Sequence, residues 1–449
     1  MNVTVVGCGY VGLVTAVGLA SVGHRVVGVE HDPARRARIA ACEVPFYEPG
    51  LPDALAARQQ DGTFRVSDEL AEALDADVIM LCVQTPQGPD GAIDLTALAN
   101  VSEDLAGLPL DDGRRRVVVV RSTVVPGTGH EVVAPRLASV CGTDTLALAS
   151  NPEFLREGSA LADFVEADRV LVGCDEQWAG QVLRRLYEPL GAPLRITGVR
   201  TAELTKYASN ALLATLVSFS NEVARLAEST PEVDAEDVFD VLQLDRRLRP
   251  IVDGQPITPG ISSYLRAGCG FGGSCLPKDV AALSAYGRSV DEATPLLDAV
   301  LAINRTQPSR LVDLAEREVG DLAGQRVAVL GAAFKGGTDD LRASPGLAVV
   351  DELLRRGARV VVHDPLVGAE ALASYQQQGV RIADDLDGAL ADVVAVLVTT
   401  NAGEYRAVGA ELPPDGPVVV DGRRVIDPAT IAAGYAGIGL AGQRLPARS

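Results

Sequence analysis

The sequence contains 449 residues, of which 47% are hydrophobic and 22% are charged, and its formal net charge at pH 7 is −20. This length exceeds what a single hydrophobic core usually holds, so we expect two or three globular domains. The acidic balance argues against nucleic acid and against an anionic membrane surface as partners, because both attract a net basic face.

Residues 1–196 alternate strand-like apolar runs with amphipathic helical stretches. Repeated βα units of this kind predict a parallel sheet with helices on both faces, which is a doubly wound α/β domain. Near-continuous valine runs such as Arg116–Val120 fit strands that are buried on both sides. The predicted strands are Asn2–Val6, Arg25–Glu30, Val78–Val83, Val117–Ser122, Leu146–Ser150 and Arg169–Gly173.

The first predicted strand leads into GCGYVG at residues 7–12, which opens a predicted helix. Glycines at this spacing permit a tight turn and let the backbone approach a pyrophosphate at the helix N-terminus. Glu30 ends the second strand, 18 residues past Gly12, where a carboxylate can accept from a ribose 2′-hydroxyl and would repel a 2′-phosphate. The pattern favours NAD over a structural βα turn that ends in a solvated glutamate. The expected cofactor contacts are Gly7, Gly9, Tyr10, Val11, Gly12 and Glu30.

The pattern changes at Thr201–Thr230 to one long helical stretch without glycine or proline. Helices continue to about residue 305, interrupted by a Gly- and Pro-rich insertion at Asp245–Gly273. A second alternating βα set follows, with predicted strands Arg326–Leu330, Arg359–His363, Val393–Val398 and Val418–Asp421. We therefore predict two Rossmann-like doubly wound domains joined by a central helical domain with a long connecting helix. The expected bounds are 1–196 for the NAD-binding domain, 197–305 for the central domain and 306–449 for the C-terminal domain.

The seven cysteines are odd in number and show no Cys-x-x-Cys spacing. This pattern is typical of individual thiols in a reducing compartment and argues against a disulfide framework or a zinc site. No apolar run approaches the ~18 residues that a membrane span requires. We therefore expect a cytoplasmic protein with no metal and no membrane partner.

The densest candidate site is GCGFGGSCLPKD at residues 268–279. Its four glycines let the backbone approach a ligand closely. Pro277 suits the first turn of a helix, which places Cys275 just before a helix N-terminus with Lys278 nearby. Both features favour a thiolate, so Cys275 is a candidate nucleophile, and a small buried side chain is the alternative. Cys269 has no such neighbourhood and is interpreted as a packing residue.

Only three of the 40 basic residues are lysines, and they are Lys206, Lys278 and Lys335. Arginine replaces lysine where a solvated charge suffices, but not where a compact, titratable ammonium is required. Lys206 and Asn210 are spaced i, i+4, so they share one helix face with apolar residues. Either this is the exposed end of the helix, or the two side chains point into a polar site.

Two further segments carry candidate polar groups. In NPEFLRE (151–157) we predict a short helix with Asn151 as its N-cap and with Glu153 and Glu157 on one face. Acids near a helix N-terminus can also serve only to complement the helix dipole. The segment 331–342, GAAFKGGTDDLR, places Lys335 and Arg342 where an anionic ligand can bind, but it lacks a full G-x-G-x-x-G pattern.

Taken in order, these segments resemble the nucleotide-sugar 6-dehydrogenase family, which includes UDP-glucose and GDP-mannose 6-dehydrogenases. The resemblance covers essentially the whole chain, is closest to the UDP-glucose enzymes, and includes all three lysines. The matching motifs are GCGYVG (7–12), PFYEPGL (45–51), STVVPGT (122–128), NPEFLREG (151–158), the Lys206/Asn210 helix, GFGGSCLPKD (270–279), FKGGTDDLR (334–342) and DGRR (421–424).

The resemblance implies two successive NAD-dependent oxidations at C6 of a nucleotide-linked hexose, from alcohol to carboxylate. An aldehyde has no hydroxyl to deprotonate, so the second oxidation first needs a covalent adduct. Cys275 is the implied nucleophile, which forms a thiohemiacetal and then a thioester that water hydrolyses.

The resemblance also assigns roles to residues around C6. Lys206 and Asn210 are implied to stabilise the developing oxyanion, with Lys206 also a candidate proton acceptor. Asp279 and Thr123 are implied to order a water, and Glu153 to act as the base for thioester hydrolysis. Further implied cofactor contacts are Thr85, Pro86, Thr123, Glu157, Lys278 and Arg342. The implied substrate contacts are Glu153, Phe154, Leu155, Lys206, Asn210, Tyr264, Leu265, Phe271, Gly272, Phe334, Lys335 and Arg424.

The nucleobase stays open between uracil, thymine and guanine. Many UDP-glucose enzymes carry Arg-Ile-Gly where this chain has Thr258–Ser263, and Ile261-Ser262 is similar to the GDP-mannose enzymes, whereas PFYEPGL favours UDP-glucose. Lys278 argues against N-acetylmannosamine nucleotides.

Two other classes of function are alternatives. A two-electron β-hydroxyacid dehydrogenase also combines a Rossmann domain with a helical domain, but it needs neither Cys275 nor a third domain. A non-catalytic nucleotide-sugar-binding protein would be expected to lack Cys275, Lys206 or Asp279, which are all present. The family further implies a homodimer, for which this sequence offers only the apolar helix Thr201–Glu228.

Overall fold

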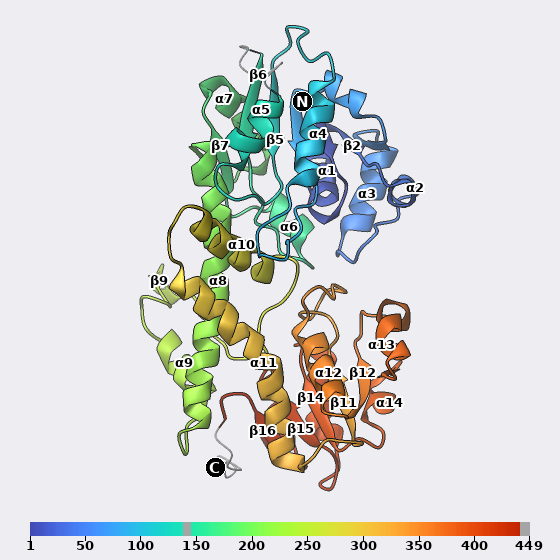
Figure 1. Ribbon diagram of the computed structural model, residues 1–449, viewed down its shortest axis with the longest axis vertical. Coiled ribbons are helices and arrows are strands. Elements are labelled where there is room, and N and C mark those ends of the chain that lie inside the picture. The colour runs from blue at the N-terminus through green and yellow to red at the C-terminus, as the bar shows by residue number, and fades with distance from the viewer. Residues whose placement is uncertain (138–144, 441–449) are drawn as a thin grey trace. The chain divides into compact units, whose positions relative to one another are not determined.

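The computed structural model describes residues 1–137 and 145–440, and the chain divides into two compact units. The first unit consists of residues 1–209 and 285–291, and the second consists of residues 210–284 together with the chain from residue 292 onward. Each unit contains one large sheet, visible in Figure 1 in blue to green for the first and in orange to red for the second. Cys141 lies outside the described residues, and the other six cysteines are free.

The sheet of the first unit has eight strands in the order β3-β2-β1-β4-β5-β6-β7-β8. All neighbouring strands are parallel except β6 and β7, which run antiparallel. The first six follow the order of a doubly wound dinucleotide-binding sheet, which confirms the predicted fold class. The strands are β1 (Asn2–Val6), β2 (Arg25–Val29), β3 (Phe64–Ser67), β4 (Val78–Leu81), β5 (Arg116–Val120), β6 (Leu146–Ser150), β7 (Val170–Cys174) and β8 (Leu194–Thr197).

Small residues let helix α1 (Tyr10–Ser21) pack closely against the glycine loop before it and against α6 (Ala160–Val165). A Cβ atom on Gly12 of α1 would lie 1.8 Å from the carbonyl oxygen of Gly7, and one on Gly18 would lie 2.3 Å from the ring of Phe164. Glycine is therefore required at both positions. The helices of this unit are α1 (Tyr10–Ser21), α2 (Pro33–Ala40), α3 (Leu51–Gln60), α4 (Thr96–Ala106), α5 (Ala134–Arg136), α6 (Ala160–Val165) and α7 (Gln177–Tyr187).

The second sheet has six parallel strands in the order β13-β12-β11-β14-β15-β16, which repeats the order of the first six strands in the other unit. The prediction of two Rossmann-like domains is confirmed. The strands are β11 (Arg326–Leu330), β12 (Arg359–His363), β13 (Arg381–Ile382), β14 (Ala395–Val398), β15 (Val418–Asp421) and β16 (Tyr435–Gly437). The helices among them are α12 (Pro345–Arg355), α13 (Ala373–Gln377), α14 (Leu386–Leu390) and α15 (Val408–Glu411).

The central part of the chain is helical, as predicted, and contains one short antiparallel hairpin. The helix α8 contributes residues to both units, because the division between residues 209 and 210 falls inside it. The expected boundary between residues 305 and 306 lies inside α11, which continues past Pro308 to Val319. The elements are α8 (Val199–Glu228), α9 (Ala235–Gln243), β9 (Ile251–Val252), β10 (Gln255–Pro256), α10 (Leu276–Ser289) and α11 (Pro295–Val319). In the described part of the chain, no helix is both long enough and apolar enough to cross a membrane.

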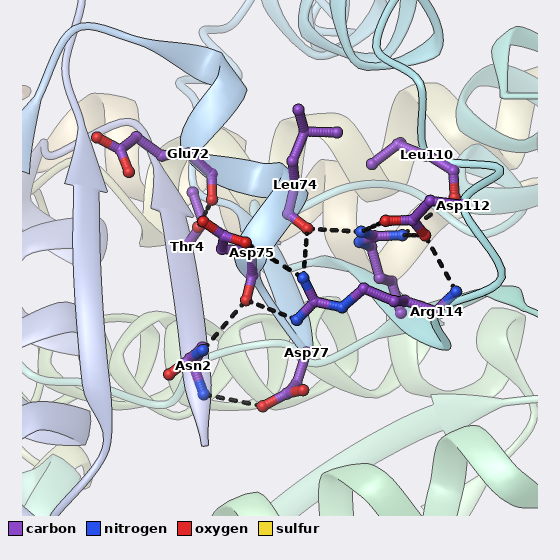
Figure 2. A network of polar contacts seen from close by, with 10 residues as sticks. Asn2, Thr4, Glu72, Leu74, Asp75, Asp77, Leu110, Asp112 and Arg114 are labelled. Carbon is purple, nitrogen blue, oxygen red and sulfur yellow. Dashed lines mark hydrogen bonds and ion pairs between the residues drawn. The ribbon is translucent and has the colours of Figure 1, made fainter.

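Polar contacts join the loops at the end of the first sheet where its parallel strands begin. Figure 2 shows Arg114 donating to the carbonyl groups of Leu74 and Asp75, and Asn2 donating to Asp75 and Asp77. The guanidinium of Arg116, which is fully buried, completes the edge with bonds to the carbonyls of Leu74 and Leu110 at 2.5 and 3.0 Å. It also pairs with both carboxylate oxygens of Asp112 at 2.7 Å. We interpret these contacts as structural, because the glycine loop follows the carboxyl end of β1, at the opposite end of the sheet.

We expect Arg116→Met to lower the free energy of unfolding by about 3 kcal/mol, because the buried carbonyl of Leu110 and the carboxylate of Asp112 lose the Arg116 guanidinium, and the carbonyl of Leu74 keeps only its bond from Arg114. Urea unfolding followed by circular dichroism measures this loss. Arg114→Met, which alters a partly exposed guanidinium in the same network, is the matched control and should cost much less. Equal losses in the two variants would contradict a special role for the buried cation.

Candidate active site

The loop between β1 and α1 is shaped for a close-approaching ligand. Gly7 has a φ of +92°, and a Cβ atom there would lie 2.9 Å from the carbonyl oxygen of Cys82. A Cβ atom on Gly9, by contrast, would meet nothing within 4 Å. Gly7 and Gly12 therefore serve the packing of the chain, while Gly9 leaves space at the first turn of α1, where Tyr10 and Val11 begin the helix. This arrangement fits the pyrophosphate of a dinucleotide.

Glu30 follows β2 and is held beside the glycine loop. Its side chain is buried, with Oε2 accepting from the backbone N–H of Cys8 at 3.1 Å and Oε1 accepting from that of Asp32 at 2.9 Å. The guanidinium of Arg35 lies 3.2 Å from Oε2. A carboxylate fixed in this way is suited to accept from the hydroxyls of a ribose, so the residues present fit NAD.

A buried ion pair lies in the same unit. The ammonium of Lys206 on α8 is 2.8 Å from Oε1 of Glu153, and both side chains are about 5% exposed. Burial disfavours the ionised form of Glu153. The charge and hydrogen bond of Lys206, the backbone N–H of Leu155 and the charge of Arg121 outweigh it and hold the pKa of Glu153 below its ordinary value. Glu153 is therefore a carboxylate at neutral pH, and Lys206 is held beside it.

The expected helix over residues 151–157 is absent, so that prediction was wrong. Residues 151–159 form no helix, and α6 begins at Ala160. The carboxylate of Glu153 instead accepts from the backbone N–H of Leu155. The side chain of Asn151 does not cap a helix, because tertiary partners use it. Its oxygen accepts from Arg121 at 2.6 Å and from the hydroxyl of Tyr187, and its nitrogen donates to the carbonyl of Leu171.

The segment after β5 carries Thr123 and is attached to the start of α8. The carbonyl of Thr123 accepts from the hydroxyl of Thr85 at 2.9 Å and from that of Tyr207 at 3.5 Å. The buried carboxylate of Glu203 accepts from the backbone N–H groups of Gly127 and Gly129 at 2.7 and 2.8 Å. Its pKa is raised, mainly by burial. Pro86 is exposed next to Thr85.

A second cluster lies in the other unit around the start of α10. Cys275 directly precedes this helix, as predicted, and its carbonyl accepts from the backbone N–H of Asp279 at 2.8 Å. The carboxylate of Asp279 is buried between two donors, the amide of Asn210 and the ammonium of Lys278, each at 2.6 Å. Cys275 is partly exposed, whereas Cys269 is fully buried and donates to the carbonyl of Thr399.

The glycine loop before Cys275 packs against the segment 334–343. The backbone N–H of Gly273 donates to the carbonyl of Arg342 at 3.0 Å, and a Cβ atom on Gly272 would lie 2.2 Å from the carbonyl oxygen of Ala343. The amide of Asn304 on α11 bonds both backbone groups of Phe271, at 2.8 and 2.9 Å. The structure thus brings the predicted residues Phe271, Gly272, Phe334, Lys335 and Arg342 into one neighbourhood.

The remaining predicted residues in this unit differ in their surroundings. Tyr264 is half-buried and Leu265 is buried, at the end of a single 3-10 turn. Arg342 is largely exposed and forms a side-chain ion pair with Asp340 at 2.8 Å.

Arg424 is occupied by a structural partner. Its guanidinium forms a two-pronged ion pair with Asp234 at 2.9 and 2.7 Å, and both side chains are largely buried. The adjacent Arg423 instead points toward the glycine loop, with its guanidinium 3.5 Å from the carbonyl of Gly270 and 3.4 Å from that of Phe334. The expected substrate contact of Arg424 remains a prediction, and Arg423 is a residue that the sequence analysis missed.

Comparison with known proteins covers three successive parts of the chain. Residues 1–191 match the NAD binding domain of the UDP-glucose/GDP-mannose dehydrogenase family, residues 200–306 match its central domain, and residues 328–428 match its UDP binding domain.

The chain belongs to this family. It is an NAD-dependent oxidoreductase that acts on a nucleotide sugar. A UDP-glucose 6-dehydrogenase of Pseudomonas aeruginosa is 39% identical over 448 residues, covering 96% of this chain and 95% of that protein. A GDP-mannose 6-dehydrogenase of Pseudomonas putida is 37% identical over 369 residues, covering 81% of each chain. A UDP-glucose dehydrogenase structure from Pyrobaculum islandicum superposes with a TM-score of 0.89 at 40% identity and covers 98% of both chains.

Glu203, Asn304 and Arg423 hold loops of the candidate site in place and were not predicted from the sequence. Glu203 was detectable in principle, since an acid at position i−3 from Lys206 shares its helix face. Asn304 and Arg423 act through contacts with segments more than 30 residues away in the chain, and no local pattern marks them.

The surroundings of Glu30 predict the cofactor preference. We expect wild-type protein to use NAD much better than NADP, and we expect Glu30→Ser to narrow this preference at least ~10-fold, because Arg35 would then face a 2′-phosphate without a competing carboxylate. The measurement is the ratio of kcat/KM for the two cofactors. Glu69→Gln, an exposed acid in the same domain, is the control. Comparable turnover of wild-type protein with NADP would contradict the role of Glu30.

Proposed function

We propose that the protein oxidises UDP-glucose at C6 to UDP-glucuronate in two NAD-dependent steps, with Cys275 as covalent nucleophile. The single observation that carries this proposal is the position of Cys275. Its thiol stands immediately before α10, and its backbone carbonyl bonds the same Asp279 whose carboxylate holds Asn210 and Lys278. A helix N-terminus and a neighbouring cation favour the thiolate form of a cysteine.

Bound NAD supplies the hydride acceptor for each oxidation. Lys206 contributes a cation, because its pairing with the ionised Glu153 keeps positive charge where the C6 oxygen becomes negative. Asn210 contributes an amide donor whose orientation is fixed by Asp279. Lys206 and Asn210 are one turn apart on α8, so one helix face presents both groups.

Cys275 makes the second oxidation possible. Its thiolate adds to the C6 aldehyde, a C–S bond forms, and the carbonyl electron pair moves onto oxygen to give a thiohemiacetal. Loss of a second hydride gives a thioester. Water then attacks the thioester carbonyl and the C–S bond breaks, which releases the carboxylate and returns the thiolate. Glu153 is the proposed base for this attack, and Asp279 and Thr123 are the proposed groups that order the water.

The proposed contacts beyond C6 follow the resemblance. Cofactor contacts are proposed at Thr85, Pro86, Glu157, Lys278 and Arg342 in addition to the glycine loop and Glu30. The nucleotide sugar is proposed to contact residues 153–155, Tyr264, Leu265, the loop at Phe271 and Gly272, and Phe334 with Lys335. Arg423 is added to this set, because its guanidinium faces that loop while Arg424 is paired with Asp234.

UDP-glucose is the preferred substrate because similar relatives over nearly the whole chain carry that name, and because the matched C-terminal domain is a UDP binding domain. The GDP-mannose enzyme of Pseudomonas putida keeps GDP-mannose as an alternative, and dTDP-glucose is another. Release of NADH with UDP-, dTDP- and GDP-hexoses, counted per mole of sugar, separates these substrates.

The role of Cys275 has a matched test in the same loop. We expect Cys275→Ser to abolish the second oxidation and to lower overall turnover more than ~100-fold, because a serine hydroxyl is a far weaker nucleophile without a base. Counting NADH released per UDP-glucose, with mass spectrometry to detect a bound thioester in wild-type protein, measures this.

Cys269→Ser is the control, since this buried side chain can keep its bond to the carbonyl of Thr399. It should still release two NADH per sugar. Two NADH per sugar at a near-normal rate from the Cys275→Ser variant would exclude the proposed mechanism and favour a reaction without a covalent intermediate.

We further propose a cytoplasmic homodimer. The free cysteines support a reducing compartment. Large apolar side chains along α8 are exposed at Leu204 (43%), Leu212 (52%), Phe219 (45%) and Leu226 (66%). Their spacing of seven to eight residues places them on one stripe of the helix, as expected for a surface that a second chain covers.

Sedimentation velocity tests this assembly. We expect wild-type protein to sediment with twice the mass of the 46.8 kDa chain. The double variant Leu212→Glu, Phe219→Glu should sediment as a monomer, because charges would lie in the apolar stripe. Leu366→Glu, which alters an exposed leucine outside α8, should leave the assembly unchanged. A wild-type monomer at assay concentration would refute the proposal.

A further inference from the structure

The motif PFYEPGL has no role in the chemistry above, yet its glutamate is buried. Glu48 lies between α2 and α3 and is 3% exposed. Within residues 1–137 and 145–440, its carboxylate accepts hydrogen bonds from one hydroxyl and two backbone N–H groups. A carboxylate is costly to bury unless hydrogen bonds replace its lost water, so the contacts of Glu48 indicate what it does.

Glu48 joins two other segments of the first unit. Its Oε2 accepts from the hydroxyl of Tyr10 and from the backbone N–H of Gly158 at 3.0 Å. Its Oε1 accepts from the backbone N–H of Leu161 at 3.4 Å, in the first turn of α6. Phe46, two residues before Glu48, adds a ring contact to Tyr10 at 4.7 Å between centroids. The motif therefore contacts Tyr10 through both the ring of Phe46 and the carboxylate of Glu48.

The two segments joined through Glu48 are the ones that carry the proposed cofactor contacts and the proposed base. Tyr10 is the first residue of α1, at the helix end where the dinucleotide fits. Gly158 has a φ of +84° and lies in the turn before α6, five residues after Glu153. Glu157 immediately precedes Gly158, and its charge also acts on the hydroxyl of Tyr10. Burial and the contact with Glu48 raise the pKa of Tyr10, so the hydroxyl stays a donor at neutral pH.

We propose that Glu48 is a positioning residue that holds the dinucleotide loop, through Tyr10, in a fixed relation to the segment of Glu153 and Glu157. NAD binding and the placement of these two acids are therefore coupled through one buried carboxylate. The role of Glu48 in NAD binding rests on the match to an NAD binding domain. The role toward Glu153 rests on the proposed function.

The proposal predicts a selective effect on NAD. A glutamine at position 48 presents one N–H group toward other donors, so Glu48→Gln loses at least one of three hydrogen bonds and disturbs the turn at Gly158. Tyr10→Phe removes one donor and leaves the ring contact with Phe46. We expect each variant to weaken NAD binding about 10-fold. We expect the double variant to be no weaker than the worse single variant, because in the proposal Tyr10 and Glu48 act on the dinucleotide loop through each other.

Calorimetric titration of NAD into substrate-free protein measures this effect. Titration of UDP into the same samples is the control for general destabilisation, which would weaken the binding of both ligands. We expect the affinity for UDP to stay unchanged. Glu43→Gln, an exposed acid in the same loop, is the matched control. Steady-state kinetics should show KM for NAD raised and two NADH still released per sugar.

Unchanged NAD binding in folded Glu48→Gln protein would overturn the proposal, as would additive effects of the two substitutions or an equal loss of UDP binding. If Glu48→Gln does not fold, Tyr10→Phe decides, and unchanged NAD binding in that variant also overturns the proposal. Failure of the proposed function gives a different result, because wild-type protein would then release one NADH per sugar while NAD binding in the variants still responded.

Discussion

Lys206 and Glu153 face each other across 2.8 Å in a place where each side chain is about 5% exposed. Neither charge is tolerable there alone, since an unpaired buried ion costs several kcal/mol (about 3–5 when one partner is removed). The pair therefore fixes the protonation of both groups and ties the segment after β6 to α8. Glu203 and Tyr207 lie in the same part of α8 and bind the segment after β5, so both loops that carry candidate chemistry are anchored on α8. The positions of the candidate site residues in the first unit depend on this attachment.

The elements that local patterns encode were predictable. β1, β6, β11, β12 and β15 have the predicted bounds, because each is a short apolar run flanked by turn residues. The glycine loop and the place of Cys275 before α10 were predictable for the same reason, since turn and helix-start signals are local.

Features that depend on residues far apart in the chain were not predictable from the sequence. Asn151 has the sequence of an N-cap, but Arg121 and Tyr187 compete for its side chain and no helix forms. Arg424 and Asp234 are 190 residues apart in the chain, and their ion pair leaves Arg423 as the residue that faces the glycine loop. β3 and β8 were missed because partly exposed edge strands lack a continuous apolar run. Competition between tertiary partners is invisible to a reading of neighbouring residues.

Each Rossmann-like sheet has an acid directly after its second strand, Glu30 after β2 and Asp364 after β12, and the two acids bond the preceding loop differently. In the first, Glu30 accepts one backbone N–H of the loop after β1. In the second, Asp364 after β12 accepts two, from Ala332 and Ala333 at 2.8 and 2.9 Å. The second loop thus has fewer free donors for a pyrophosphate, in agreement with its match to a UDP binding domain rather than an NAD binding domain.

The continuity of α8 has a consequence for how this segment can change over evolution. The separation of Lys206 and Asn210 is set by helical rise at ~6 Å, and their common direction is set by a rotation of ~100° per residue. Side chains elsewhere on the helix can be exchanged without altering either value. Insertion or loss of a single residue between the two would turn one group away from the other's face by ~100°. We therefore expect this part of the helix to accept substitutions during evolution but not insertions or deletions between Lys206 and Asn210.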